Sequence, residues 1–322
     1  METLNLSGCN NPELSVYLAA VRSLKSLDLS RTATSKPIEF SEGFNSLTSL
    51  NLYSSNVKAF KYGTKDVSTY EGEQVLDLSK FKLTGLDVRY NSSKYIKFNN
   101  SKTQPLNISS LTFTGCTSLI RVFGHIVVSN NTSFNGLNNF TIHGRDNNEY
   151  PTKGAWYGPD TDVSSTTWDD DSDLQTNFNL TATSLNNKFQ KTNCNMFDVY
   201  YILQKCSAVT SLYYTFAECW NAVTDLNNPL RRDTFAECGN VTNTSSLFYA
   251  TRVAGPLYSA VHNGTSQTGA AGLIQPLKNL TNPTGMFSSS GTKYIDDMFF
   301  YFGDLKFTNI TSFFAHDRGD NV

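Results

Sequence analysis

The chain has 322 residues, of which 39% are hydrophobic and 17% are charged, and its formal net charge is −2. Its longest apolar runs, such as residues 16–21, are far shorter than the roughly 20 residues of a membrane-spanning helix, which excludes a membrane span. Lysine and arginine form no cluster along the chain, so the sequence also argues against nucleic acid as a partner.

A short strand pattern opens the chain and is then repeated. Residues 24–30 read L-x-x-L-x-L-S, and similar segments lie at residues 1–7 and 47–53. Leu4, Leu27 and Leu50 occupy the same position in the three segments and are evenly spaced by 23 residues. Alternate side chains of a strand point to opposite faces, so we expect the leucines to face a core and the residues between them to face outward. A period in the range of roughly 20–29 residues predicts a solenoid of stacked coils.

The spacing becomes irregular further along. Leu76 and Leu86 belong to two copies of the pattern that are only 10 residues apart, which is too short for a whole coil. We therefore expect some coils to carry two short strands on opposite sides. The loops are rich in Asn, Ser, Thr and Gly, which indicates little helix. Further strands are predicted near residues 96–98, 111–113 and 140–142, and the first repeat block is predicted to span residues 1–146.

Residues 147–195 break the repeat pattern and are predicted to be an insertion or a junction between two repeat blocks. This stretch contains the acidic run Asp169, Asp170, Asp171 and Asp173. Clustered carboxylates suit a calcium ion, but the spacing D-x-[DN]-x-[DN]-G of a calcium loop is missing. A solvated loop is therefore the favoured interpretation of the acidic run.

The second repeat block is predicted to span residues 196–322 and follows a different phrase. The segment Thr-Phe-Ala-Glu-Cys occurs at residues 215–219 and again at 234–238, and we expect the two copies to be equivalent. A seven-residue phrase that begins with Thr-Asn and ends in Phe occurs at three places with the same internal spacing: residues 242–248, 281–287 and 308–314.

These motifs resemble a known family. Residues 76–91 resemble the short leucine-rich repeats of surface proteins from Bacteroidetes, and residues 241–249 are similar to the V-T-N-M-S-x-M-F-Y phrase of the BspA-like repeats. The two Phe-Ala-Glu-Cys copies fit the F-x-x-C step of that family. The resemblance implies a β-rich, leucine-rich-repeat (BspA-like) solenoid in two repeat blocks with an irregular insertion between them. It also implies a role as an adhesin, a host-matrix binder or part of a larger surface or virion protein.

The cysteines and histidines of this sequence form no recognisable metal-binding or catalytic motif. The six cysteines include no C-x-x-C, and Cys9, Asn91 and Cys116 occupy the inward-facing N/C position of the repeat, so we expect structural roles and mostly free, buried thiols. Cys194 and Cys206 are able to pair, although their spacing does not require it. The four histidines lie in unrelated segments without a nucleophile motif. We expect no metal ion, no cofactor and no catalysis, while a carboxylate pair for glycan cleavage stays open as an unfavoured alternative.

The predicted function is non-catalytic recognition or adhesion, in which the chain binds a protein or a glycan at an extracellular location, on a cell surface or on a virion. The alternative is a structural or receptor-binding component of a bacteriophage virion or tail. The first repeat begins at Met1 without a capping segment, and two interpretations fit: the chain is a piece of a longer protein, or a partner or a further chain covers the solenoid end. The outward residues of the strands are the candidate binding residues, unless they form only a solvated sheet face: Ser26, Asp28, Ser30, Ser49, Asn51, Tyr53, Asp77, Asp87 and Arg89.

Overall fold

The structure is a computed structural model, and the chain divides into two compact units. Unit 1 comprises residues 1–142 and 170–179, and unit 2 comprises residues 143–169 and 180–322. Most of the predicted insertion at 147–195 lies outside the described residues, and so does its acidic run. The residues that the structure describes are 1–11, 21–99, 108, 111–142, 176–222, 234–251, 274, 276–290 and 307–314.

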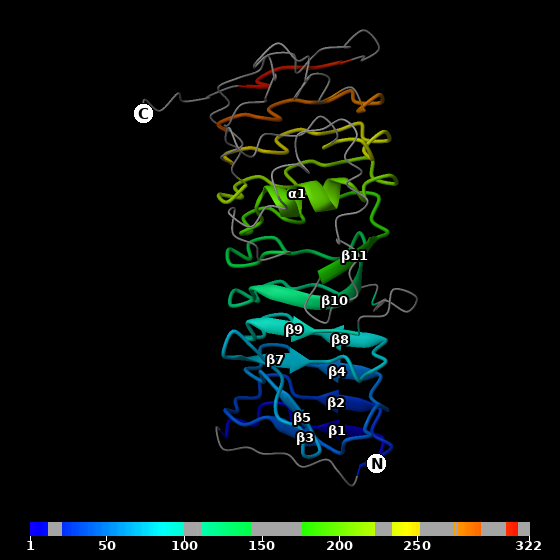
Figure 1. The fold of residues 1–322 in the computed structure, drawn as a ribbon, viewed down its shortest axis with the longest axis vertical. Helices are drawn as coiled ribbons and strands as arrows, with labels where there is room; N and C mark the ends of the chain where they lie inside the picture. The colour runs from blue at the N-terminus through cyan, green and yellow to red at the C-terminus, as the bar shows by residue number, and fades with distance from the viewer. Residues whose placement is uncertain are drawn as a thin grey trace, which may run out of the picture. The chain divides into compact units, whose positions relative to one another are not determined.

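The first sheet of unit 1 is built from the predicted leucine strands. Leu4, Leu27, Leu50 and Leu86 pair in register from one strand to the next, and all the pairings are parallel. Leu27 and Leu50 are almost fully buried, as the alternating pattern predicts. The four strands form one column in Figure 1, in the order β1 (Thr3–Asn5), β2 (Ser26–Asp28), β4 (Ser49–Asn51) and β8 (Gly85–Asp87).

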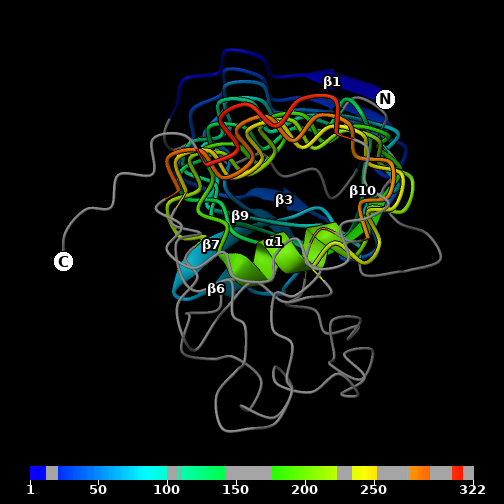
Figure 2. The ribbon, with the colours of Figure 1, turned by 90° about the horizontal axis from the view of Figure 1, so that it is seen from above.

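The other strands of unit 1 lie on a different side of the coil. In the view of Figure 2, β1 lies on one side of the unit 1 coil, and β6 and β7 lie on the opposite side. Leu76 and Leu86 therefore lie in different sheets, which confirms the prediction of two strands in a single coil. The second sheet has the order β11 (Thr176–Leu180), β10 (Arg121–Val128), β9 (Tyr95–Lys97), β7 (Glu73–Asp77) and β6 (Thr69–Tyr70), and β3 (Ile38–Phe40) pairs with β5 (Phe60–Tyr62).

Unit 2 is also a stack of parallel coils, but these coils contain little regular strand. Single parallel bridges join Ser184 to Ser211, Ser211 to Asn243 and Asn243 to Asn282. Exposed threonines before the bridge positions at residues 211, 243 and 282 each donate a hydrogen bond to the carbonyl of the equivalent threonine one coil earlier, over intervals of 27, 32 and 39 residues. Thr308 continues this series with a bond to the Thr281 carbonyl, 27 residues earlier. The helix α1 (Met196–Leu203) is the only helix among the described residues, so the β-rich prediction holds for that part of the chain.

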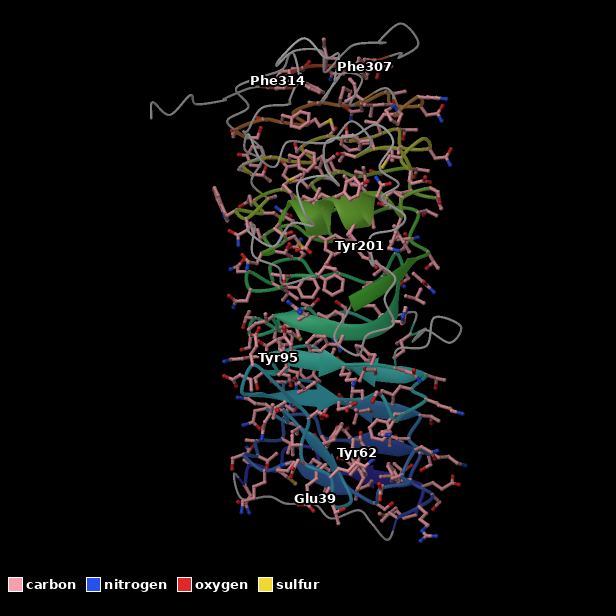
Figure 3. All side chains as sticks on the ribbon, viewed as in Figure 1. Glu39, Tyr62, Tyr95, Tyr201, Phe307 and Phe314 are labelled. Atoms are coloured by element: carbon pink, nitrogen blue, oxygen red, sulfur yellow. The ribbon has the colours of Figure 1, made fainter. Side chains whose placement is uncertain are left out.

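Phenylalanine rings stack through the core of unit 2. Successive ring centroids are 5.5–6.2 Å apart and the rings are nearly parallel, so each coil contributes one ring to a continuous ladder. The last ring, Phe314, is labelled in Figure 3. The ladder confirms that the three seven-residue phrases are equivalent, because each phrase ends at one of its rings. Its members are Phe189, Phe216, Phe248, Phe287 and Phe314.

The predicted equivalence of the two Thr-Phe-Ala-Glu-Cys segments is wrong. Phe216 belongs to the ladder, and Cys219 lies 3.4 Å from the hydroxyl of Thr192. Cys238 belongs to another part of the coil, where its thiol donates to the carbonyl of Leu203 at 3.6 Å. Both segments place a phenylalanine in the core and a small residue three positions later, so one local sequence serves two different turns of the coil.

Candidate functional site

The acidic and amide residues of the first sheet end each strand with the same turn. Asp28 Oδ1 accepts a hydrogen bond from the Ser30 N–H at 2.8 Å, and Asn51 Oδ1 accepts one from the Tyr53 N–H at 3.0 Å. Asp87 Oδ1 accepts the Arg89 N–H at 3.1 Å in the same way. Asp and Asn favour such turns because the side chain satisfies the backbone two residues further on. These three candidate residues therefore have a structural role, whatever ligand the surface binds.

The residue after each turn has a left-handed backbone. Arg31, Ser54 and Tyr90 have φ values of 55°, 55° and 59°. The backbone N–H of Arg31 donates to the Tyr53 carbonyl of the next coil, and that of Ser54 donates to the Arg89 carbonyl, both at 2.8 Å. A left-handed residue turns the chain sharply, so the side chains around it are held at the corner of the coil.

Four side chains gather at this corner and form what we call the tyrosine–arginine cluster: Tyr53, Asp87, Arg89 and Tyr90. The rings of Tyr53 and Tyr90 meet edge to face at 5.6 Å, and the Arg89 guanidinium lies 5.2 Å from the Tyr53 ring centroid. Arg89 donates to both carboxylate oxygens of Asp87, at 3.0 and 2.7 Å. Tyr90 is 51% exposed, so the cluster is open to solvent.

Charge within the tyrosine–arginine cluster is balanced. The hydrogen bonds from Arg89 lower the pKa of Asp87, against an opposing effect of partial burial. The carboxylate is therefore ionised at neutral pH, and the pair has no net charge. A paired Arg and Asp beside the exposed ring of Tyr90 and the half-buried ring of Tyr53 present several hydrogen-bonding atoms and an apolar ring surface together.

Gly115 of the following coil supports this cluster and was missed by the sequence reasoning. A Cβ on Gly115 would lie 2.2 Å from Cδ1 of Tyr90, so the ring packs where any other side chain would stand. Gly115 also has a φ of +74°, which other residues rarely adopt. The sequence signal was its place two residues after Phe113, which matches the place of Gly8 two residues after Leu6.

The remaining candidate residues lie in different surroundings. Ser26 and Ser49 pair in register along the same sheet, and Ser49 is exposed. Ser30 is only 8% exposed, and its hydroxyl lies 2.9 Å from that of Ser7. Asp77 lies in β7, which belongs to the second sheet, and is also buried. The structure thus brings Tyr53, Asp87 and Arg89 together and separates Asp77 from them.

Asp77 stabilises the second sheet instead. Its Oδ1 accepts hydrogen bonds from the Ser79 N–H at 2.9 Å and the Ser79 hydroxyl at 2.6 Å. Its Oδ2 accepts the Ser68 hydroxyl at 3.0 Å, and its backbone carbonyl accepts the Tyr62 hydroxyl at 2.8 Å. With four hydrogen bonds donated to it from within the chain, Asp77 has little capacity left for a ligand.

The inward-facing N/C position has the predicted structural role. Asn91 Nδ2 donates to the Ser55 and Val57 carbonyls at 3.1 and 3.2 Å, and the Cys116 thiol donates to the Val88 carbonyl at 2.9 Å. All six cysteines are free and five of them are buried. Burial raises the pKa of both Cys116 and Cys219 to about 11, so these thiols are protonated and poorly nucleophilic at neutral pH.

Unit 2 carries tyrosines at a corresponding corner, which the sequence reasoning also missed. Tyr213 is 38% exposed and directly precedes the left-handed residue Tyr214, as Tyr53 precedes Ser54. The ring of Tyr214 lies 4.6 Å from that of Tyr213 and 5.9 Å from that of Tyr249, one coil further. The adjacent pair Tyr213–Tyr214 was the available signal in the sequence.

Comparison with protein-family models, curated proteins and solved structures finds no match to this chain. Among the described residues, no helix is long and apolar enough to cross a membrane, and no three His, Cys, Asp or Glu side chains are grouped to hold a metal ion.

Proposed function

We propose that this chain is a non-catalytic recognition module that binds a glycan on a cell surface through the tyrosine–arginine cluster. The observation that carries this proposal is the edge-to-face contact of Tyr53 with Tyr90 beside the Asp87–Arg89 ion pair. Tyrosine and arginine are enriched among the side chains that contribute most to recognition surfaces, and tyrosine buries a large area at a small cost in side-chain entropy.

The surroundings of the cluster favour a glycan over a protein. Tyr90 and Met1 are the only large hydrophobic side chains that are exposed in the described part of unit 1. The core of a protein interface is usually apolar, whereas sugar hydroxyls require hydrogen-bonding groups beside an aromatic ring. The cluster provides the hydroxyls of two tyrosines, the carboxylate of Asp87 and the guanidinium of Arg89 for that purpose.

The finer fold assignment is part of the same proposal. We assign the unit 1 coils to the leucine-rich-repeat, BspA-like type, which the resemblance in the sequence suggests. The register of Leu4, Leu27, Leu50 and Leu86 supports this assignment, as do the inward hydrogen bonds of Asn91 and Cys116. Repeats of this kind serve recognition because each coil adds side chains to a continuous surface.

A glycan array tests the proposal. The full chain is labelled and applied to an array of neutral and acidic glycans beside the variant Tyr90→Ala. We expect the wild-type chain to bind a defined subset of glycans and the variant to lose that binding. The proposal is overturned if the wild-type chain binds no glycan, or if Tyr90→Ala binds the same subset equally well.

A further inference from the structure

A second polar site lies in the other sheet of unit 1, at the first residue of β10. Arg121 is in register with Tyr95 of β9, and its side chain is only 8% exposed. The rings of Tyr70, Tyr95 and Phe123 surround this position, with centroids 5.0–6.0 Å apart. Tyr95 is labelled in Figure 3. The site shares no residue with the tyrosine–arginine cluster, so it is independent of the proposed function.

The guanidinium of Arg121 has aromatic neighbours, whereas the described part of the chain offers it no anion. Its Cζ lies 5.4 Å from the Tyr70 ring centroid and 5.7 Å from that of Phe123, and Nη1 donates to the Tyr70 hydroxyl at 3.2 Å. Nε is buried and has no hydrogen-bond partner. Among the described residues, no carboxylate forms an ion pair with Arg121; Glu71 accepts the Tyr95 hydroxyl instead, at 2.9 Å.

A buried cation without an anion costs free energy, because cation–π contacts and one tyrosine hydroxyl replace little of its hydration. Nε–H and one Nη2–H point in the same direction and form a fork that matches the two oxygens of a carboxylate. Nη1 is held by Tyr70, whereas Nε on the other edge has no acceptor among the described residues. The unsatisfied Nε therefore indicates which edge of the guanidinium a ligand would use.

We propose that the Nε–Nη2 edge of Arg121 binds a carboxylate group. Tyr70 covers the site from β6, the two-residue strand at the end of the sheet order, so a small displacement of this strand admits the ligand. The carboxylate comes from an acidic ligand such as a uronic acid.

Saturation-transfer NMR of the full chain with glucuronate, and with glucose as the neutral probe, tests the proposal. We expect saturation of glucuronate but not of glucose. Arg121→Met should abolish the signal, and Arg121→Lys should weaken it because lysine lacks the fork. Arg31→Met, which changes an exposed arginine in the turn after β2, should leave the signal unchanged. Equal saturation of glucuronate in wild type and Arg121→Met overturns the proposal. Absence of a glucuronate signal from the folded wild-type chain also overturns the proposal.

Thermal unfolding monitored by circular dichroism shows whether a variant that loses the NMR signal is still folded. Arg121→Met should unfold at a temperature no lower than the wild-type chain, because methionine replaces a buried unpaired charge by an apolar side chain of similar length. If that variant does not fold, Tyr70→Phe is used in its place. It retains the ring but removes the hydroxyl that holds Nη1, and it should weaken glucuronate binding several-fold. Unchanged binding in Tyr70→Phe would then overturn the proposal.

Discussion

Tyr90 and Gly115 lie in consecutive coils, and the ring of Tyr90 fills the space that a side chain on Gly115 would occupy. The backbone N–H of Tyr90 donates to the Thr114 carbonyl at 2.9 Å, which places Gly115 beside the ring. A Cβ on Gly115 would lie 2.2 Å from Cδ1 of Tyr90. The most exposed side chain of the tyrosine–arginine cluster is therefore positioned by a glycine of the next coil.

Gly115→Ala should displace the Tyr90 ring and destabilise unit 1. We expect the free energy of unfolding to fall by about 2–3 kcal/mol, which combines the strain of a left-handed alanine with the steric overlap. Gly136→Ala is the matched control, because Gly136 has a similar φ of +77° but no atom within 4 Å of the place where the alanine methyl group would stand. Gly136→Ala should cost about 1 kcal/mol. Equal losses of stability in the two variants, measured by urea unfolding, would contradict the packing role.

Asn91→Ala should be strongly destabilising. The substitution removes the buried hydrogen bonds from Asn91 Nδ2 to the Ser55 and Val57 carbonyls, and it removes the acceptor of the buried Ser93 N–H, so we expect a loss of about 2–4 kcal/mol. Asn139→Ala is the control, because Asn139 is exposed and its amide makes one bond, to the Thr117 carbonyl at 3.1 Å. That variant should lose less than about 1 kcal/mol. Urea unfolding of both variants checks the difference, and a small loss in Asn91→Ala would argue against the ladder role.

Phe216→Ala should open a cavity between two rings of the phenylalanine ladder. Its ring stacks on Phe189 at 5.7 Å and on Phe248 at 6.2 Å, and it is fully buried. We expect a loss of about 3–5 kcal/mol in unfolding free energy. Trp220→Ala removes a larger aromatic ring that is 58% exposed, and it should change stability by less than about 0.5 kcal/mol. A larger loss of thermal stability in Trp220→Ala than in Phe216→Ala would contradict the ladder.

Asp87→Asn should change the response of stability to acid. The asparagine keeps the oxygen that accepts the Arg89 N–H, but it loses the ion pair with the guanidinium. Because Arg89 lowers the pKa of Asp87 in the folded chain, the ion pair stabilises the fold above the unfolded pKa of about 4 and is lost as pH falls through the folded value. The stability difference between wild type and variant, at most about 1 kcal/mol at pH 7, should vanish below that range. A difference that does not change with pH in urea titrations would refute the ion pair.

Much of unit 1 was predictable because its leucines carry both spacing and register. The even intervals between Leu4, Leu27 and Leu50 predict one column of strands, and the short step from Leu76 to Leu86 predicts two strands in one coil. The sequence does not indicate which side of the coil a strand joins. Asp77 and Asp87 both follow a leucine of the same pattern, yet one lies buried in the second sheet and the other lies at the exposed corner.

Unit 2 was less predictable for a physical reason. Its coils are held by single bridges and ring stacking, so the alternation that marks a strand is weak. One coil also contains more than one turn with a buried phenylalanine, which made the segments ending at Cys219 and Cys238 look equivalent. The tyrosines at the unit 2 corner, Tyr213 and Tyr214, have no pattern that separates an exposed corner from a core position.

The affinity of Tyr90→Ala for a glycan identified on the array tests the central claim most directly. Isothermal titration calorimetry of this variant should show an affinity at least tenfold lower than that of the wild-type chain, a loss of about 1.4 kcal/mol in binding free energy. Tyr213→Ala removes a comparable exposed tyrosine of unit 2 and should bind as tightly as wild type. Unchanged affinity in Tyr90→Ala, with a normal unfolding curve, would contradict recognition through the tyrosine–arginine cluster.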